Sequence, residues 1–228
     1  MLAAQLINNS FPSVHLLDKA SFALQLMEDY DVQHLCVVTD EKFVGIVDKN
    51  TLLDTHEAAV IATLQNEFIV ASVHADEHFL AGAKLLSLHE LTMLPVVSTT
   101  ADLLGVITAK QMLTVLTSYV GADTKGGVIV LEIERRQYSF GEIVRLVETN
   151  DAYVTQLNTT TDPVTGLMLV SIQLNRIEVS TIVATFQRYD YRVKYYFGEE
   201  NYQNELQENY NHLLSYRKVS DCNFLVTR

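Results

Sequence analysis

Two stretches of the sequence decide the fold, because one reads as a copy of the other. Residues 94–108 read LPVVSTTADLLGVIT, and residues 35–48 read LCVVTDEKFVGIVD. Each stretch has a run rich in β-branched residues, a polar turn, and a second such run around one glycine, at Gly105 and Gly45. This pattern predicts two strands joined by a turn in each copy.

The repetition extends on both sides of these stretches. Residues 14–53 match residues 73–113 at an offset of 59, which becomes 60 after one inserted residue. Each copy reads as a short strand, a helix with an apolar stripe, two strands and a second helix. The stripes consist of Ala20, Ala23, Leu24, Met27 and Tyr30 in the first copy, and of Leu80, Ala83, Leu86 and Leu91 in the second. A unit of about 50 residues is too small to bury both faces of its sheet, so we expect the two copies to pack face to face.

The motif of hydrophobic–Pro–Val–Val, a polar turn, and hydrophobic–Gly–hydrophobic–hydrophobic–Thr resembles the cystathionine-β-synthase (CBS) domain. The resemblance covers roughly residues 1–118. It implies a tandem CBS pair, with one repeat over residues 1–60 and the second over residues 61–120.

The resemblance also implies a ligand, because the cleft between two CBS copies often binds an adenine nucleotide. In the family motif Gly–h–h–Thr/Ser–x–x–Asp, where h is hydrophobic, the hydroxyl faces phosphate and the Asp binds the ribose hydroxyls. The implied site residues are Thr108, Gln111, Lys110 and Pro95 in the second copy, and Asp48 and Thr51 in the first. Gln111 replaces the family's Asp, and Asp48 replaces its Thr, where a carboxylate repels phosphate. The alternative is that both sites are vestigial and the pair is a packing or dimerisation unit.

The region after residue 127 has a different pattern. It predicts a strand at 128–133, a helix at 139–149 with Ser139 as N-cap, strands at 152–157 and 167–174 around a turn at 162–166, a helix at 178–189, and a strand at 192–197. The order β-α-β-β-α-β is ferredoxin-like, and the fold class is therefore α+β. After a CBS pair, this region, 128–198, resembles an ACT domain, a regulatory module that often binds an amino acid. Tyr138 stands where the ACT family often has a glycine, so a dimerising or packing module is the alternative.

The predicted domains are completed by a linker and a tail. Residues 121–127 are small, polar and glycine-containing, as in a linker. Residues 199–228 form a predicted helical tail, which ends in a short strand at 224–226 and whose apolar stripe is Tyr202, Leu206, Tyr210, Leu213 and Leu214. The whole order resembles the bacterial acetoin-utilisation-type CBS–ACT proteins.

Composition and charge exclude several classes of protein. The chain has 228 residues, 48% of them hydrophobic, and a formal net charge of −12, which argues against a protein that grips nucleic acid or an anionic membrane. All arginines lie at or beyond Arg135, and the acidic excess falls mainly before residue 126, which indicates two modules.

Two cysteines make no disulfide framework, and Cys36 lies in a predicted buried strand, where a thiol is inert. No signal peptide or spanning segment is visible, so a cytoplasmic protein is expected.

Catalytic and metal-binding patterns are weak. His74 and His78 are four residues apart, but they lie at a predicted strand end and a helix start and need not share a face. There is no phosphate-binding loop and no Gly-x-Ser-x-Gly sequence, so we expect no metal site and no enzymatic activity.

Two functions therefore remain open. The first is a regulatory ligand sensor without a required cofactor, which binds AMP in preference to ATP because its CBS pair is acidic. The second is a constitutive oligomerisation or scaffold protein with degenerate sites. A homodimer is the expected assembly, and the scaffold hypothesis predicts a stable dimer or larger.

Overall fold

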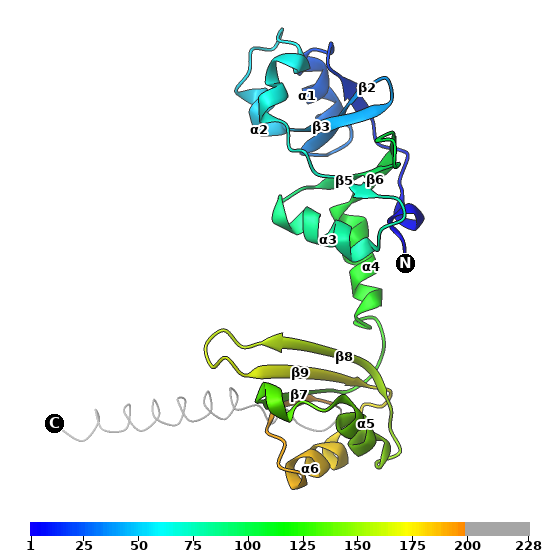
Figure 1. Ribbon diagram of the computed structural model, residues 1–228, viewed down its shortest axis with the longest axis vertical. Helices are drawn as coiled ribbons and strands as arrows, with labels where there is room; N and C mark the ends of the chain where they lie inside the picture. The colour runs from blue at the N-terminus through cyan, green and yellow to red at the C-terminus, as the bar shows by residue number, and fades with distance from the viewer. Residues whose placement is uncertain (199–228) are drawn as a thin grey trace, which may run out of the picture. The chain divides into compact units, whose positions relative to one another are not determined.

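The computed structural model describes residues 1–198, which form two compact units (Figure 1). The first unit runs from Met1 to Leu116, and the second begins at Thr117. The predicted tail at 199–228, with its helix, its strand at 224–226 and Cys222, lies outside the described residues.

The first unit contains the two repeats that the sequence predicts. The first repeat consists of η1 (Ala3–Leu6), β1 (Ser13–His15), α1 (Ala20–Asp29), β2 (His34–Thr39), β3 (Lys42–Asp48) and α2 (Lys49–Leu53). The second repeat consists of η2 (Ile61–Glu67), β4 (Val73–His74), α3 (Phe79–Leu88), β5 (Met93–Val97), β6 (Leu103–Thr108) and α4 (Ala109–Tyr119). The predicted order of strand, helix, strand, strand and helix is thus confirmed in both copies.

The two sheets repeat each other in pairing as well as in order. Strand β1 pairs in parallel with β2, and β2 pairs antiparallel with β3. Strands β4, β5 and β6 have the same arrangement. Even the irregularity recurs, because the register shifts between Val37 and Val38 in one sheet and between Val96 and Val97 in the other.

Each sheet is extended by a segment from the opposite repeat. Asn8, which precedes the first repeat's sheet, pairs with Val106 of β6, and Ile69, which precedes the second repeat's sheet, pairs with Ile46 of β3. These crossing segments explain the motif glycines. A Cβ added at Gly45 would lie 2.7 Å from the Cβ of Phe68, and one at Gly105 would lie 2.5 Å from Cγ2 of Ile7. Only glycine leaves room for the crossing segments and their side chains.

The hydrophobic core is shared between the repeats for the same reason. Met93 and Val106 of the second repeat pack in the cluster built mainly from the first, while Ile46 of the first repeat packs in the other cluster. The apolar stripes are only partly correct. Ala20, Ala23 and Met27 are buried, whereas Tyr30 remains 45% exposed because it lies just beyond the end of α1. Leu80 is also more than one-third exposed.

The second unit has the predicted ferredoxin-like order. It consists of β7 (Val128–Ile133), η3 (Arg135–Gln137), α5 (Phe140–Glu148), β8 (Val154–Thr161), β9 (Met168–Leu174), α6 (Ser180–Arg188) and β10 (Val193–Phe197). The strands form one antiparallel sheet in the order β10-β7-β9-β8. Alternate residues of β7 and β9 pack against α5 and α6 in a single core, so both helices cover the same face of the sheet (Figure 1).

Two sequence expectations for this unit need correction. The strand predicted at 152–157 begins at Val154 and continues to Thr161, because its threonines, which carry no apolar alternation, still pair with β9. The apolar spacing of the helix at 139–149 predicts a buried face of Phe140, Ile143, Val144 and Val147, but Phe140 is 54% exposed and Leu146 is buried instead. Ser139 is the N-cap as predicted, and its hydroxyl accepts a hydrogen bond of 3.4 Å from the Glu142 backbone N–H.

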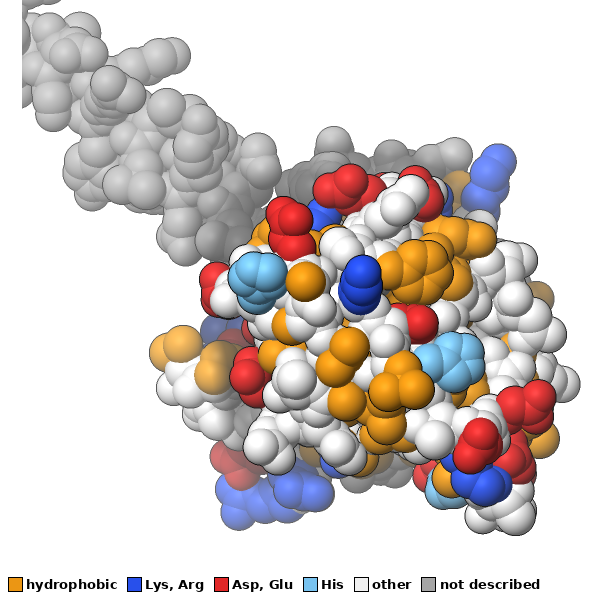
Figure 2. All heavy atoms as spheres, turned by 90° about the horizontal axis from the view of Figure 1, so that it is seen from above, with side chains coloured by type: hydrophobic (Ala, Val, Ile, Leu, Met, Phe, Trp, Pro, Cys, Tyr) orange, Lys and Arg blue, Asp and Glu red, His pale blue; other side chains and the backbone are white. Residues whose placement is uncertain are grey.

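The surface over the first repeat is mixed in character. It carries acidic, basic and histidine side chains between scattered hydrophobic ones, and no single-sign field is seen on this face (Figure 2). No helix among residues 1–198 is long and apolar enough to cross a bilayer.

Candidate functional site

A cavity of about 380 Å³ lies in the first unit, at the start of α4. Its walls come from the segment before β1, the turn after α1, the residue before β5, and the β6–α4 junction. The lining residues are Phe11, Tyr30, Asp31, Val32, Thr92, Thr108, Ala109 and Lys110. Both repeats therefore contribute to it, as expected for a cleft between two copies.

One side of this cavity is aromatic and acidic. The rings of Phe11 and Tyr30 have centroids 6.2 Å apart and are tilted by 47°. Asp31 follows directly and has a positive φ of 51°, a conformation that Asp tolerates better than most residues and that ends the turn after α1. The cavity thus offers ring faces for stacking and a carboxylate that accepts hydrogen bonds.

Another part of the lining is the N-terminus of α4. The hydroxyl oxygen of Thr108 accepts a hydrogen bond of 3.1 Å from the Gln111 backbone N–H, so Thr108 caps the helix. Its own O–H remains a donor. Lys110 adds a positive charge in the first turn, where the helix dipole is also positive. This side is suited to an anion.

The structure brings only some of the predicted site residues together. Thr108 and Lys110 line the cavity, whereas Gln111 does not. The side-chain oxygen of Gln111 is buried, and it has no hydrogen-bond partner among residues 1–198. Pro95 is buried in β5 opposite Val106, at a position before the two residues that β4 pairs with, so its missing N–H interrupts no ladder there.

The corresponding residues of the first repeat serve the local structure. Asp48 caps α2: its carboxylate accepts hydrogen bonds from the backbone N–H of Thr51, at 3.0 Å, and from the Thr51 hydroxyl, at 2.5 Å. Burial alone would raise the pKa of Asp48, but these hydrogen bonds outweigh it and hold the pKa below its usual value. Asp48 and Thr108 therefore perform the same capping role in the two repeats, with and without a charge.

A histidine connects the repeats next to this cavity. The Nδ1 atom of His34, in β2, lies 2.9 Å from the hydroxyl of Thr92 and accepts the Thr92 backbone N–H at 3.2 Å. Burial lowers the pKa of His34, and the nearby carboxylate of Asp48 opposes this effect only in part. Thr92 is a cavity residue, so the contact ties the cavity wall of the second repeat to the first.

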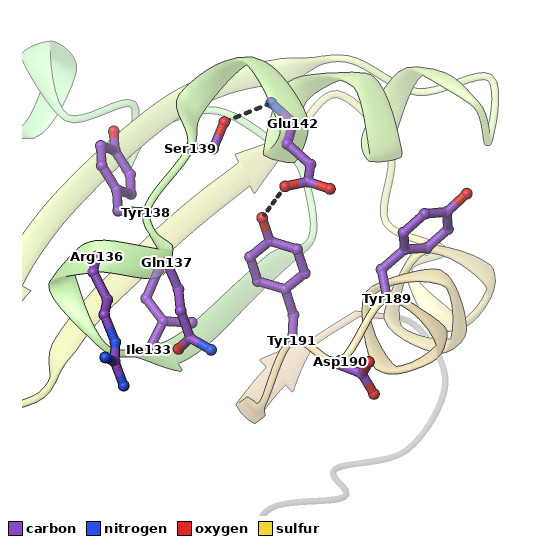
Figure 3. Close-up of a pocket in the computed structure, with 9 residues that line it drawn as sticks. All are labelled: Ile133, Arg136, Gln137, Tyr138, Ser139, Glu142, Tyr189, Asp190 and Tyr191. Atoms are coloured by element: carbon purple, nitrogen blue, oxygen red, sulfur yellow. Dashed lines mark hydrogen bonds between the residues drawn. The ribbon is translucent and has the colours of Figure 1, made fainter.

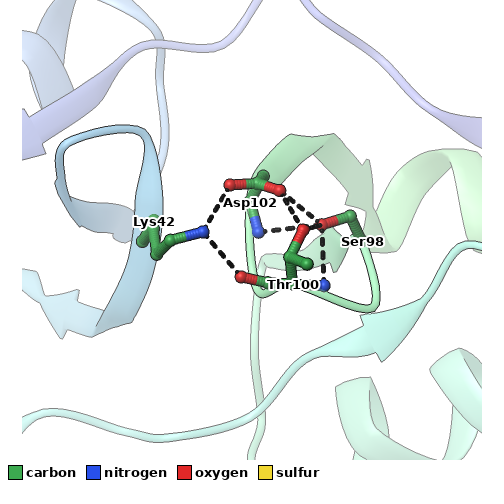
Figure 4. Close-up of polar contacts among 4 residues, drawn as sticks. All are labelled: Lys42, Ser98, Thr100 and Asp102. Atoms are coloured by element: carbon green, nitrogen blue, oxygen red, sulfur yellow. Dashed lines mark hydrogen bonds and ion pairs between the residues drawn. The ribbon is translucent and has the colours of Figure 1, made fainter.

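A second contact between the repeats joins their two turns (Figure 4). Lys42 donates to the carboxylate of Asp102 at 2.7 Å and to the carbonyl of Thr100 at 2.8 Å. The hydroxyls of Ser98 and Thr100 also donate to Asp102. The Lys42 ammonium and these hydroxyls hold the pKa of Asp102 well below its usual range. Because Lys42 and Asp102 are both partly exposed, this contact contributes mainly to alignment of the turns.

The second unit has its own cavity, also about 380 Å³, beside η3 and the start of α5 (Figure 3). It is lined by Ile133, Arg136, Gln137, Tyr138, Ser139, Glu142, Tyr189, Asp190 and Tyr191. The Tyr191 hydroxyl donates to Glu142 at 3.0 Å. Burial, together with Glu142, raises the pKa of Tyr191 to about 12. Tyr138, which the sequence resemblance predicts to stand where an ACT domain often has a glycine, lines this cavity.

Residues 1–198 contain no group of three or more His, Cys, Asp or Glu side chains able to hold a metal ion. Cys36 is fully buried, and burial raises the pKa of its thiol to about 12, so the reactive thiolate is strongly disfavoured.

Comparison with known proteins identifies one family in the first repeat. Residues 3–56 match the family model of the CBS domain. No curated protein matches the chain. Among solved structures, the chain is similar to a CBS domain pair/ACT domain protein from Thermotoga maritima, with 22% identity and a TM-score of 0.49, over 53% of this chain and 100% of that one.

Two further solved structures have similar values. One is a putative acetoin utilization protein from Vibrio cholerae, with 22% identity and a TM-score of 0.42, over 55% of this chain and 98% of that one. The other is CBSX2 in complex with AMP, with 20% identity and a TM-score of 0.45, over 52% of this chain and 97% of that one.

Proposed function

From the CBS domain at residues 3–56 and the second repeat of the same topology, we infer a CBS domain pair, and we propose that it makes this protein a non-catalytic regulatory sensor of an adenine nucleotide, with AMP favoured. The observation that carries the proposal is the cavity at the start of α4. It combines aromatic rings, a carboxylate and a positive helix N-terminus within one space of about 380 Å³.

Each part of a nucleoside monophosphate has a chemically suitable partner in this cavity. The rings of Tyr30 and Phe11 suit the adenine base, since bases stack on aromatic side chains. Asp31 suits the ribose diol, because a carboxylate accepts both hydroxyl hydrogens. The Thr108 hydroxyl, the first turn of α4 and the Lys110 ammonium suit the phosphate. Asp31 thus takes the role that the family resemblance gives to the position of Gln111.

The size and charge of the cavity favour AMP over ATP. A volume of 380 Å³ is at the small end of ligand pockets, which span about 300–1,000 Å³. Lys110 is the one cationic side chain among its lining residues, and Asp31 adds a negative charge to the same lining. A single cation compensates one phosphate group better than three.

The sensor proposal also needs a response to the ligand. Ligand binding changes the protein only if the two states of the protein bind it differently. Because the cavity is built from both repeats, we propose that AMP changes their packing, and that the ACT-like unit or a partner of the homodimer transmits the change.

Calorimetric titration of the full chain with AMP, ATP and adenosine tests the proposal. We expect AMP to bind most tightly and to raise the melting temperature, because a ligand that binds only the folded state stabilises it. Replacing Thr108 with Val should weaken AMP binding by about 3–10-fold through the lost hydroxyl. The matched control is Thr114→Val, on the same helix, where the hydroxyl donates to the Lys110 carbonyl and does not line the cavity.

The alternative function is a constitutive scaffold with degenerate sites. It is favoured by the capping role of Asp48, which occupies the ligand position of the first repeat. A stable dimer that no adenine nucleotide affects, at millimolar concentration, would support the scaffold and contradict the sensor.

The residues that line the cavity of the second unit are suited to binding a second ligand. Its walls offer a guanidinium at Arg136 and carboxylates at Glu142 and Asp190, which together suit the carboxylate and ammonium groups of an amino acid. We propose amino-acid binding there, in line with the ACT resemblance. A titration with a panel of amino acids, in which Glu142→Gln abolishes any binding observed, tests this site separately from the nucleotide cavity.

A further inference from the structure

His34 occupies a position that links three parts of the first unit. His34 is the first residue of β2 and is only 8% exposed. Its ring reaches Thr92, 58 positions later in the chain and directly before β5. Opposite it in the β2–β3 register lies Asp48, the cap of α2.

The contact with Thr92 determines which ring nitrogen carries the proton. The backbone N–H of Thr92 points at Nδ1 at 3.2 Å and can only donate. Nδ1 must therefore be the acceptor, so that neutral His34 carries its hydrogen on Nε2. The Thr92 hydroxyl, at 2.9 Å from the same atom, then donates as well. If the ring is protonated, an N–H at Nδ1 faces the Thr92 backbone N–H and that hydrogen bond is lost, while the Thr92 hydroxyl has to turn from donor to acceptor.

Thr92 connects His34 to the N-terminus of α4, which lines the cavity. Its carbonyl accepts a hydrogen bond of 2.9 Å from the N–H of Ala109, the first residue of α4. The next residue, Met93, pairs with Thr108 across β5 and β6. Thr92, Thr108 and Ala109 all line the cavity. The position of Thr92 therefore sets the position of the α4 N-terminus, where we placed the phosphate.

The charged surroundings of His34 are simple. Asp48 on β3 is the charged group whose field reaches the ring, and it attracts a proton to it. The segment before β5, on the other side, presents the uncharged Thr92. From α2, Lys49 contacts this region through its backbone, whose N–H donates to the Gln33 carbonyl. Burial outweighs Asp48, so the pKa of His34 lies below its usual value and the neutral ring predominates at neutral pH.

We propose that His34 is a positioning residue for the cavity at the start of α4, and that its protonation breaks the hydrogen bond from the Thr92 backbone N–H, shifts Thr92 and weakens ligand binding at acidic pH. This inference rests on the proposed nucleotide function for its binding readout, but the coupling of His34 to the cavity wall does not. The ligand-bound state requires the neutral ring, so the affinity falls by up to about tenfold for each pH unit below the pKa of His34 in the free protein.

The test compares the full chain with two variants. His34→Asn keeps an acceptor oxygen near the position of Nδ1 but does not titrate. His89→Asn is the matched control, because His89 is an exposed histidine at the C-terminal end of α3. AMP affinity is measured by calorimetry between pH 5.5 and 7.5. In parallel, the His34 ring and the Thr92 and Ala109 amides are followed by NMR over the same range without ligand.

We expect the affinity of the wild type and of His89→Asn to fall more steeply on acidification than that of His34→Asn. The AMP phosphate also titrates, with a pKa of about 6, but it does so equally for all three proteins. We further expect the Thr92 and Ala109 amide signals to shift together with the His34 ring. Equal pH profiles for the wild type and His34→Asn overturn the proposal, as do amide signals that stay constant while the ring titrates. If AMP binds none of the proteins, the nucleotide function fails, and the amide titration alone decides whether His34 positions Thr92.

Discussion

Gly105 is the residue at which the fold of the first unit is most sensitive to one added carbon. It has a positive φ of 143°, which L side chains rarely adopt. A Cβ placed there would overlap the Asn9 side-chain oxygen, lie 2.5 Å from Cγ2 of Ile7 and approach the carbonyl oxygen of Asn8 to 3.1 Å. Part of this obstacle is backbone, which has no rotamer to move out of the way.

The cost of Gly105→Ala follows from two contributions. A strained φ costs about 1–3 kcal/mol, and overpacking at a tight site costs about 1–3 kcal/mol more. We therefore expect the substitution to lower the free energy of unfolding by about 2–6 kcal/mol. Gly45→Ala meets Phe68 at 2.7 Å without the positive φ, so only the packing contribution applies and the loss should be smaller.

Urea denaturation, monitored by circular dichroism, measures these losses of stability. Gly141→Ala is the control, because nothing lies within 4 Å of a Cβ at that position in α5, and alanine there should be neutral or slightly stabilising. Hydrogen exchange localises the effect, since Asn8 and Val106 exchange backbone hydrogen bonds of 2.8 and 3.1 Å. A Gly105→Ala protein as stable as the wild type, or one less affected than Gly45→Ala, would refute the reasoning.

Three further substitutions test the local electrostatics. Asp48→Ala removes the cap of α2 and should cost about 1 kcal/mol at neutral pH; because the pKa of Asp48 is lowered in the folded state, urea denaturation should show this difference disappearing as the pH falls below about 4. Asp102→Asn breaks the contact of the two turns with Lys42, and the stability difference from wild type should shrink with added salt and with acid, since protonation of Asp102 removes the same interaction. Tyr191→Phe loses the hydrogen bond to Glu142 and should cost about 1 kcal/mol. Since the pKa of Tyr191 is raised to about 12, that stabilisation should persist to about pH 10 and be lost above it. In an ultraviolet titration the variant should lack a tyrosine that ionises near pH 12.

The strands could be predicted from the sequence because their signals are local. The β-branched runs mark β2, β3, β5 and β6, and the strand predicted at 128–133 has the same bounds as β7. The partners of Gly45 and Gly105 could not be predicted in this way. The segments that cross them come from the opposite repeat, and no local pattern in residues 7–9 or 68–69 indicates where they pair.

The cavity was predicted in part, for a similar reason. The repeated motif indicated Thr108 and Lys110, which end a strand and begin a helix. Tyr30 was assigned to the helix core because it follows Met27 by three positions, although the helix ends at Asp29. For Asp31, the repeat in the sequence carries a signal. Asp31 matches Glu90 at the repeat offset, both residues are acidic, and both have a positive φ, at 51° and 52°.

The two repeats differ most where their motifs end, and the difference has a physical logic. Thr108 and Asp48 both cap the following helix, so exchanging threonine for aspartate preserved the cap and changed only the charge. In the second repeat the uncharged cap leaves the α4 N-terminus able to attract an anion. In the first repeat the Asp48 carboxylate itself occupies the positive N-terminus of α2. Asp48 also raises the proton affinity of His34, whose ring contacts the cavity residue Thr92. We infer that the first repeat supports and regulates the ligand site of the second instead of forming an equal one. A titration that finds one AMP per chain, lost with Thr108→Val and altered in its pH dependence by Asp48→Asn, is the result this division requires; two equivalent sites per chain would contradict it.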